Sequence, residues 1–310
     1  APRLDYSTGA EAFLLEPQST NLALRSNELD LWSSKVNMST TPNYSLSPDG
    51  NINSNRLLFS GNGYTHNNLA QSSGIVYSVS VYAKRNSGSG AVGFFTNGSG
   101  VINYAFNVTS EWQRFEYTFT STNLSITGIA GDLGADVSIY GFQKEQQSYA
   151  TSYIPTSGAS ATRNQELCTN ATPVINSEEG TLYAEISALA DDGTYRILAL
   201  SNGTSAQRIY MQYTNASNSI SVVVKNGSVT QANIGYTLSD ETEFSKIGFK
   251  YKLNDFALWV NGVKVATDTS GLTPIGLSEL SFDNGSGGNN FFGNTKGLKY
   301  YPKALADVQL

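Results

Sequence analysis

The stretch Leu258-Trp259-Val260-Asn261-Gly262-Val263-Lys264-Val265 decides the fold class of this chain, because it predicts a β-hairpin. Apolar residues flank an Asn-Gly pair, and these two residue types accept the positive φ angles of a two-residue type I′ turn. We therefore expect two antiparallel strands that meet at Asn261 and Gly262.

The same alternation of apolar and polar residues recurs along the chain. It is clear in VYSVSVY (76–82), FEYTF (115–119) and LYAEI (182–186), and clusters of Gly, Asn and Ser separate such runs. Helical periodicity is confined to short stretches at 22–31 and 304–310. The pattern predicts an all-β fold of half-buried antiparallel strands.

The chain is long enough for two domains, since single domains commonly have about 100–200 residues. Alternation stops after Ile154, and Pro155 removes a donor from any ladder. The sequence then stays small and polar until alternation resumes near Thr181. We predict one domain over residues 1–163, a linker over 164–177 and a second, unrelated domain over 178–310.

Composition excludes several classes of partner. The net charge is −6 and the longest basic groups are pairs such as Lys84-Arg85, so nucleic acid and anionic membranes are poor partners. No apolar run approaches the roughly 18 residues of a membrane span, so no membrane insertion is expected. The single cysteine, Cys168, excludes an intramolecular disulfide and a cysteine-based zinc cluster.

Two segments of the first half resemble a known kind of module. PRLDYSTGAEAFLLEPQSTNLALRSNELDLW (2–32) and VSIYGFQKEQQSYATSYIPTSGASATR (137–163) are similar to a module of phage tail-fibre and other virion surface proteins. Within that half, TNLALRSNELDLW, SEWQRFEYTFT and VSIYGFQKE resemble strands of a carbohydrate-binding-module jelly roll. The resemblance implies a β-sandwich of roughly eight to ten strands.

The second half resembles a laminin-G or concanavalin-A-like lectin sandwich. The residues that carry this resemblance are FSKIGFKYKLNDFALWVNGVKVATD (244–268) and GLKYYPKALADVQL (297–310). The expected architecture is therefore two antiparallel β-sandwiches, a jelly roll followed by a concanavalin-A-like domain.

Catalytic constellations are not recognisable in the sequence. A retaining glycosidase needs two carboxylates roughly 5 Å apart on one face. The acidic pairs at 178–179 and 191–192 are adjacent, so in a strand they face opposite ways, and SDETE (239–243) is predicted to be a solvated loop. The only histidine, His66, has no G-x-S-x-G partner for a triad. We predict that the chain is not an enzyme.

A glycan site needs aromatic ring faces beside amides and charged groups. Tyr82 and Lys84 fall on the solvent face of the strand predicted at 76–84, and Tyr64, His66 and Asn103 lie in or near Gly/Asn-rich loops. We predict that these five residues form a shallow glycan-binding groove. The alternative is that the aromatic side chains cover a sheet face without binding a ligand.

Structural calcium is a further expectation that comes from the resembled folds. Asp5 and Glu16 near the start, with Asp136 or Glu145, are placed where a carbohydrate-binding jelly roll holds calcium, an ion that accepts oxygen ligands in loose geometry. The alternative is that these acids are solvated. No other cofactor is expected.

The resemblances together imply a non-enzymatic viral attachment protein, a fibre, spike or capsid decoration at the virion surface. It would bind host surface polysaccharide, contact other virion proteins and form a homo-oligomer, with a trimer favoured, so that weak sites act together. Two alternatives remain open. One is a purely structural virion spacer, and the other is the non-catalytic carbohydrate-binding portion of a secreted bacterial glycan-degrading enzyme.

Overall fold

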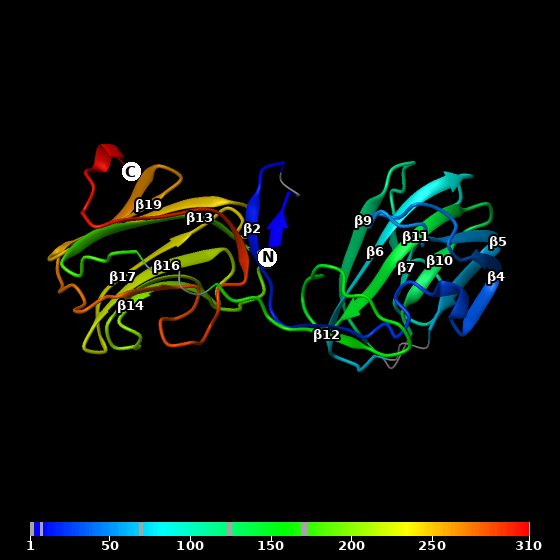
Figure 1. Cartoon of the computed structure of the whole chain (residues 1–310), viewed down its shortest axis with the longest axis horizontal. Coiled ribbons are helices and arrows are strands. Elements are labelled where there is room, and N and C mark those ends of the chain that lie inside the picture. The colour runs from blue at the N-terminus through cyan, green and yellow to red at the C-terminus, as the bar shows by residue number, and fades with distance from the viewer. Residues whose placement is uncertain (1–2, 7–8, 68–70, 123–125, 169–172, 310) are drawn as a thin grey trace. The chain divides into compact units, whose positions relative to one another are not determined.

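The chain folds into two compact units, each made of antiparallel β-strands. The computed structural model describes residues 3–6, 9–67, 71–122, 126–168 and 173–309 (Figure 1). One unit combines Ala1–Pro17 with Gln165–Leu310, and we call it the terminal unit. The other is the continuous segment Gln18–Asn164, which we call the inserted unit. The predicted all-β architecture of two sandwiches is confirmed. No helix in the described ranges is long and apolar enough to cross a membrane.

The terminal unit is a sandwich of a seven-stranded and a five-stranded sheet. The strand orders are β1-β2-β22-β13-β18-β19-β20 and β17-β16-β15-β14-β21. The bounds in the first sheet are β1 (Arg3–Asp5), β2 (Ala12–Leu15), β22 (Gly293–Tyr301), β13 (Glu179–Ala188), β18 (Ser245–Lys252), β19 (Asp255–Val260) and β20 (Val263–Asp268). Those in the second are β17 (Val229–Thr237), β16 (Ser219–Asn226), β15 (Arg208–Tyr213), β14 (Arg196–Ser201) and β21 (Glu279–Ser281).

Alternation in these strands separates a buried face from an outer face. In β18, Ile247, Phe249 and Tyr251 are fully buried in the core between the sheets. Lys246 and Lys250 have the opposite parity and project from the outer face. Burial of apolar side chains at roughly 25 cal/mol per Å² is the main force that holds the two sheets together.

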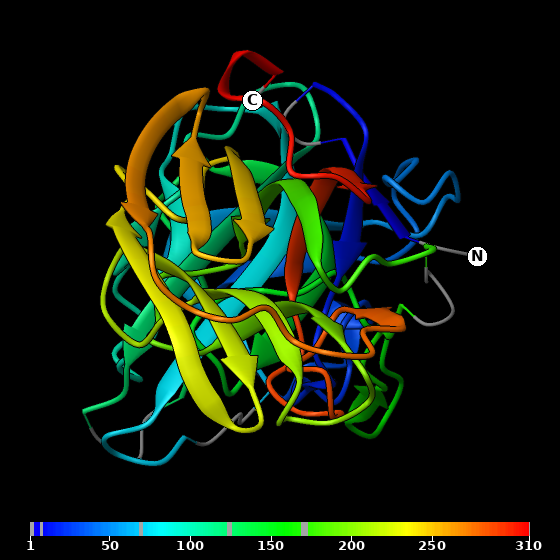
Figure 2. The same cartoon turned by 90° about the vertical axis from the view of Figure 1, so that its left-hand side faces the viewer.

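The hairpin predicted from Asn-Gly is confirmed. Val260 ends β19 and pairs with Val263 of β20, and the two turn residues have φ angles of 51° at Asn261 and 79° at Gly262. Both angles fit a type I′ turn. Figure 2 shows this orange hairpin with the red C-terminal turn η2 (Asp307–Gln309) close to it.

The inserted unit is a jelly-roll-like sandwich built on an eight-stranded sheet. Its strand order is β8-β7-β10-β5-β11-β6-β9, and β4 also pairs with β5. The bounds are β4 (Ser34–Thr41), β5 (Asn55–His66), β6 (Val76–Ser87), β7 (Val92–Phe95), β8 (Tyr104–Ala105), β9 (Gln113–Thr120), β10 (Gly128–Gly131) and β11 (Asp136–Glu145). A separate pair joins β3 (Ser19–Asn21) to β12 (Ala161–Arg163), and η1 (Leu29–Leu31) is a single 3-10 turn.

The string YATSYIPTSGA (149–159) closes the inserted unit. The Tyr153 hydroxyl lies 2.6 Å from Ser26 Oγ, and the Thr156 N–H donates to the same oxygen at 2.8 Å. The buried Asn21 side chain donates to Ile154 O at 2.8 Å. These bonds tie the end of the unit to its beginning, so the residues that carry the resemblance to virion modules serve the fold itself.

The domain boundary differs from the prediction of one domain over 1–163. Residues 1–17 belong to the terminal unit, because β2 adds to β22 with Phe13 opposite Thr295, and Leu15 enters that unit's core. The predicted linker at 164–177 is anchored at its start, since the Glu166 N–H donates to Glu16 O at 2.9 Å. The short run AFLL carries the same apolar pattern whichever sheet it joins, so the sequence could not identify its partner strand.

The SDETE segment (239–243) is a loop with four exposed residues, as predicted, but its central residue, Glu241, is buried. Glu241 is only 1% exposed, and its Oε2 atom has no hydrogen-bond partner. Burial and, to a smaller extent, the nearby carboxylates Asp191 and Asp192 together raise the pKa of Glu241 to about 7, and Arg196 opposes this shift. Arg196 is itself buried and bound to Asp192 at 2.9 Å, so it does not fully neutralise Glu241.

Replacing this carboxyl by an amide should stabilise the protein in a pH-dependent way. Because the folded-state pKa is raised, the native chain keeps a proton that the unfolded chain has lost, and stability falls as the pH rises from about 4.5 to about 7. We expect Glu241→Gln to match the wild type at pH 4 and to exceed it by about 2 kcal/mol at pH 8. Urea unfolding at both pH values measures the difference, and the exposed Glu243→Gln is the control. An equal effect of Glu241→Gln at both pH values would contradict the account.

Candidate functional site

Three of the predicted glycan-binding residues lie at one end of the sheet in the inserted unit. The rings of Tyr64 and His66, near the end of β5, stack with centroids 5.8 Å apart, and Phe95 meets both rings edge-on. Asn103 closes the loop after β7, where its Oδ1 accepts the Thr96 N–H at 2.7 Å. Burial lowers the pKa of His66, which keeps its ring neutral at physiological pH.

A hollow of about 300 Å³ adjoins this cluster, but neither Tyr64 nor His66 lines it. Its lining residues are Asn62, Gly63, Ala91, Gly100, Val101, Ile102, Ala105, Ala130, Gly131 and Asp132. A Cβ added at Gly100 would come 2.2 Å from the Tyr64 ring, so the loop backbone rests directly on that ring. Tyr64 therefore supports the loop at the edge of the hollow, and the hollow itself offers no aromatic face.

Tyr82 and Lys84 belong to a different part of the sheet. Lys84 pairs in register with Ser138, which pairs with Arg56 near the start of β5, whereas Tyr64 lies near the end of that strand of 12 residues. At about 3.3 Å per residue, the two ends of such a strand are roughly 20 Å or more apart. The five predicted residues therefore do not form a single groove, because the strand order β5-β11-β6 separates them.

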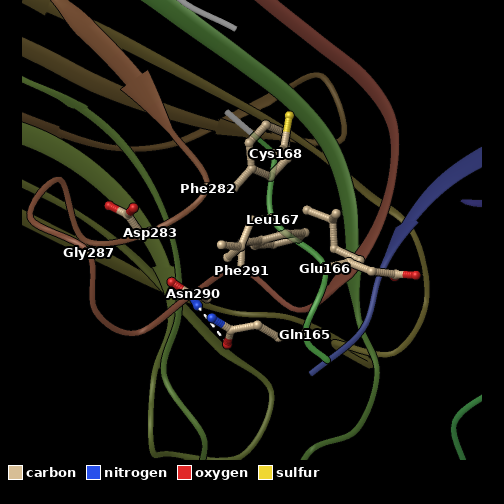
Figure 3. A pocket seen from close by; sticks show the side chains of 10 residues that line it. Gln165, Glu166, Leu167, Cys168, Phe282, Asp283, Gly287, Asn290 and Phe291 are labelled. Carbon is tan, nitrogen blue, oxygen red and sulfur yellow. Dashed lines mark hydrogen bonds between the residues drawn. The ribbon is translucent and has the colours of Figure 1, made fainter. Parts of the chain in front are cut away.

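A second cavity, of about 140 Å³, lies beside Cys168 in the terminal unit (Figure 3). Phe282, Phe291 and Leu15 form its apolar wall, and Asn290 donates to Gln165 at 3.3 Å on its polar side. Burial raises the pKa of the Cys168 thiol, which favours its protonated form. The cavity is well below the roughly 300 Å³ of usual ligand pockets and is too small for a sugar.

The four acids predicted to bind calcium are divided between the two units. Asp5 and Glu16 belong to the terminal unit, whereas Asp136 and Glu145 stand at opposite ends of β11 in the inserted unit. No group of three or more metal-ligating side chains occurs within the described ranges. Calcium binding at these acids stays a prediction.

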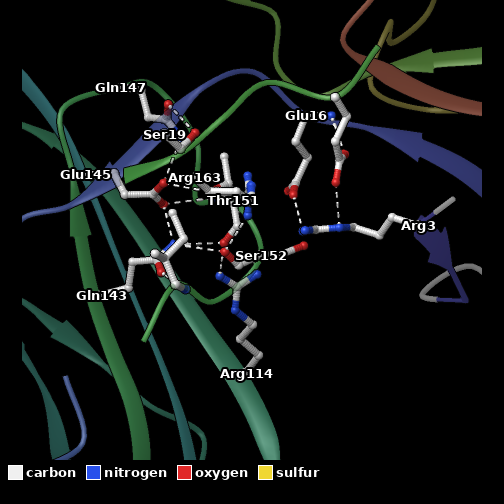
Figure 4. Close-up of polar contacts among 12 residues, drawn as sticks. Arg3, Glu16, Ser19, Arg114, Gln143, Glu145, Gln147, Thr151, Ser152 and Arg163 are labelled. Atoms are coloured by element: carbon white, nitrogen blue, oxygen red, sulfur yellow. Dashed lines mark hydrogen bonds and ion pairs between the residues drawn. The ribbon is translucent and has the colours of Figure 1, made fainter. Parts of the chain in front are cut away.

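Three of these acids, Glu16, Asp136 and Glu145, already bind groups of the chain itself through the oxygens that a calcium ion would need. Arg3 binds Glu16 at 2.6 Å, and Arg56 grips both oxygens of Asp136 at 2.9 and 2.7 Å (Figure 4 shows the Arg3 pair). This grip is the main reason that the pKa of Asp136 falls to about 2. The buried Glu145 accepts the N–H and hydroxyl of Thr151 at 2.8 and 2.6 Å, and burial raises its pKa.

The strongest candidate site lies on the outer face of the seven-stranded sheet in the terminal unit. The register aligns one residue from each of five neighbouring strands, in the order Lys299, Tyr183, Gly248, Trp259 and Lys264. Gly248 has no side chain, so a gap lies over β18 between the two aromatic residues. We call the gap and its two aromatic walls the aromatic slot.

The slot opens as a hollow of about 260 Å³. It is lined by Tyr183, Lys246, Gly248, Trp259, Asn261 and Gly262. Trp259 is only 3% exposed and is held in place by its neighbours, whereas Tyr183 is half-buried. The Trp259 wall is therefore fixed before any ligand arrives, and Tyr183 is the more exposed of the two walls.

Lysine ammonium groups surround the slot. Lys299 Nζ lies 5.8 Å from the centroid of the Tyr183 ring, and Lys250 and Lys264 each place Nζ 5.8 Å from the Trp259 centroid. In strand order, Lys299 is on the far side of Tyr183 from Gly248, and Lys264 is on the far side of Trp259. Lys299 and Lys264 thus lie outside the two aromatic residues, whereas Lys246 and Lys250 stand on β18 itself, two residues to either side of Gly248.

Sequence reasoning did not assign this site, although a signal for it was present. In FSKIGFKYK (244–252), Lys246, Gly248, Lys250 and Lys252 alternate with buried apolar residues, so one face of a single strand carries three cations and a glycine. That pattern could have marked the strand as an outward-facing basic surface. Only strand pairing, however, could show that Tyr183 and Trp259 flank the glycine.

Comparison with known proteins gives only distant similarities. Neither a protein-family model nor a curated protein matches the sequence. Among solved structures, the CBM40 module of Ruminococcus gnavus IT-sialidase bound to alpha2,3 sialyllactose is 18% identical, over 44% of this chain and 82% of that chain, with a TM-score of 0.38. The leech intramolecular trans-sialidase is 19% identical over 44% of this chain and 23% of that chain, with a TM-score of 0.37.

A third similar structure, domains LG4-5 of the mouse laminin alpha1 chain, covers 94% of this chain and 92% of its own, at 11% identity and a TM-score of 0.32. At these identities and scores the comparisons identify no ligand and no site residue. The chemistry of the site must therefore be argued from this chain's own residues.

The Arg56–Asp136 pair leads to a test of the calcium question. Asp136→Asn should lower the free energy of unfolding by about 1–3 kcal/mol at pH 7, because it leaves the guanidinium of Arg56 without its carboxylate. The wild type should lose the same contribution as the pH falls from about 4 towards 2, since the folded-state pKa is depressed. Thermal unfolding should give the same difference in stability between the wild type and Asp136→Asn in calcium as in EDTA. The exposed Asp132→Asn is the control. Calcium that stabilises the wild type but not Asp136→Asn would show that Asp136 is a ligand after all.

Proposed function

We propose that this chain is a non-catalytic carbohydrate-binding protein and that the aromatic slot receives one sugar ring. The observation that carries the proposal is the alignment of Tyr183 and Trp259 on either side of Gly248 on one sheet face. Pyranose rings have C–H-rich faces that pack on aromatic side chains, while amides and charged groups bind their hydroxyls.

Polar groups at the rim suit sugar hydroxyls. The Asn261 Oδ1 atom accepts a hydrogen bond from the Lys246 backbone N–H at 2.9 Å. The side-chain NH₂ of Asn261 can then donate to a sugar hydroxyl. Lys246 lines the hollow and is exposed. A hollow of about 260 Å³ lies just below the usual range for small-molecule pockets, so it suits a single ring bound weakly.

The residues of the slot support binding without catalysis. Hydrolysis of a glycoside ordinarily requires two carboxyl groups on either side of the bond. The six residues that line the hollow are Tyr183, Lys246, Gly248, Trp259, Asn261 and Gly262, and none carries a carboxyl group. We infer that the protein releases a bound sugar without cleaving it.

The setting that we propose is the surface of a virus particle, where the chain attaches the particle to host polysaccharide. This part rests on the resemblance of residues 2–32 and 137–163 to modules of phage tail fibres and other virion surface proteins. A weak site is useful there when several copies act together, so we propose a homo-oligomer, with a trimer favoured. Mass spectrometry of purified particles tests the setting, and detection only in a bacterial secretome would point to an accessory module of a secreted enzyme instead.

Removing one wall of the slot should weaken sugar binding. Because an aromatic contact is worth about 1 kcal/mol, Tyr183→Ala should raise the Kd for a saccharide chosen from a glycan array by about five- to tenfold. Isothermal titration calorimetry gives the Kd, and Tyr82→Ala in the inserted unit is the matched control. Unchanged affinity in Tyr183→Ala, with a loss in Tyr82→Ala, would move the site to the inserted unit.

The intact chain should release no reducing ends from a polysaccharide that it binds. A reducing-sugar assay over a prolonged incubation, with a known glycosidase as positive control, makes the comparison. Release above the buffer rate that survives purification to homogeneity would overturn the non-catalytic assignment.

A further inference from the structure

Positive charge is concentrated on the sheet that carries the aromatic slot. Six of the chain's eleven lysines lie on strands β18, β20 and β22, although the chain as a whole has a net charge of −6. They are Lys246, Lys250, Lys252, Lys264, Lys296 and Lys299. The five strands β13, β18, β19, β20 and β22 also carry four acids, Glu179, Glu185, Asp255 and Asp268, so six lysines minus four carboxylates leave a local charge of +2. This local excess has the opposite sign to the charge of the whole protein and favours an anionic ligand at this face.

The lysines around the slot are only partly neutralised. Lys250 pairs with Asp255 at 3.0 Å, but Lys246 and Lys299 make no ion pair with any residue that the structure describes. Glu185 faces Lys246 across the β13–β18 register and accepts a long hydrogen bond from the Tyr183 hydroxyl at 3.4 Å. Two carboxylates, Glu185 and Asp255, thus stand beside the four ammonium groups of Lys246, Lys250, Lys264 and Lys299, which leaves the rim positive before the C-terminal turn is counted.

A carboxylate of the chain itself already occupies part of this rim. Asp307 binds Lys264 at 2.5 Å and lies 3.8 Å from Lys250, and both of these lysines lie over the Trp259 ring. The arrangement shows that this pair of lysines can hold an anionic group beside an aromatic wall of the slot.

Asp307 reaches the rim on a short and weakly held segment. The turn η2 is exposed, and the segment before it is held by Thr181, whose hydroxyl donates to Lys303 O and accepts the Leu305 N–H, both at 3.0 Å. Figure 2 shows this red segment close to the orange hairpin. Exposed ion pairs contribute little to stability, so a competing anion can displace Asp307 readily.

We propose that the aromatic slot binds an acidic sugar whose carboxylate or sulfate replaces Asp307 on Lys264 and Lys250, so that the C-terminal turn acts as an internal competitor. The inference rests on the proposed function, since it assigns the ligand class and the regulation of the same slot. A ligand that carries both a ring and an acid group stacks on the aromatic walls and pairs with Lys264 and Lys250. A neutral sugar makes only the stacking contact.

The competitor role gives a test in which a mutation improves binding. The probes are tetragalacturonic acid and its fully methyl-esterified form, which keeps the rings and removes the charge. Asp307→Asn in the full chain should tighten binding of the acid by about three- to tenfold, because the lysine pair becomes free, and should leave the ester unchanged. The control Asp268→Asn makes the same charge change on β20, where Asp268 binds only the local turn at Ser270 among the described contacts.

Two further variants separate charge from ring contact. Lys264→Gln should weaken binding of the acid by about tenfold and make the remaining binding less sensitive to salt. Lys252→Gln, on the same sheet but paired with Glu179, should change the affinity less than twofold. Gly248→Leu fills the gap and should abolish binding of both acid and ester. A sulfated galactose oligomer, run in parallel, distinguishes sulfate from carboxylate recognition, and binding of either acid supports the proposal.

The possible failures have different meanings. If acid and ester bind equally and Asp307→Asn has no effect, the acidic-sugar inference is wrong while the proposed function stands. If inorganic polyphosphate competes as well as the sugar acid, the surface binds charge alone and the inference is likewise overturned. If Gly248→Leu binds both probes as the wild type does, the slot is not the sugar site and the proposed function fails.

Discussion

The register of β13, β18 and β19 is the constraint on which both the core and the site of the terminal unit depend. Leu182, Phe249 and Leu258 lie side by side on the inner face, and Tyr183, Gly248 and Trp259 lie side by side on the outer face. Because side chains alternate in a strand, a shift of one residue would send each set to the other face. The hydrophobic core therefore fixes the geometry of the aromatic slot, and the slot needs no separate scaffold.

Sequence patterns predicted the local elements well and the long-range pairings poorly. The Asn261-Gly262 turn and the alternating strands depend on neighbouring residues, so they could be read directly. The addition of β2 to β22 joins segments nearly three hundred residues apart, and its apolar run fits either unit. The inability to foresee strand pairing also explains why the predicted glycan groove was wrong. Tyr64 and Tyr82 share a face of the sheet, but the strand order β5-β11-β6 keeps them apart.

Residues that stand out in a sequence can serve the fold rather than the function. The YATSYIPTSGA string (149–159) uses its tyrosine, threonine and backbone groups to bind the segment around Ser26, so its distinctiveness reflects the closure of the inserted unit. Glu241 shows the opposite case: its polar surroundings in the sequence predict an exposed residue, but it is buried with one oxygen unpaired. In both cases the decisive information is which distant groups lie nearby.

The central claim, that a sugar ring enters between Tyr183 and Trp259, has a direct spectroscopic test. The chain has three tryptophans, Trp32, Trp112 and Trp259, so a ¹H–¹⁵N spectrum shows three indole N–H signals, which single replacements by Phe can assign. On titration with a bound saccharide, the account predicts that the Trp259 signal shifts in a saturable way while those of Trp32 and Trp112 stay fixed. A saturable shift of Trp112 with Trp259 unmoved would place the ligand in the inserted unit and contradict the account.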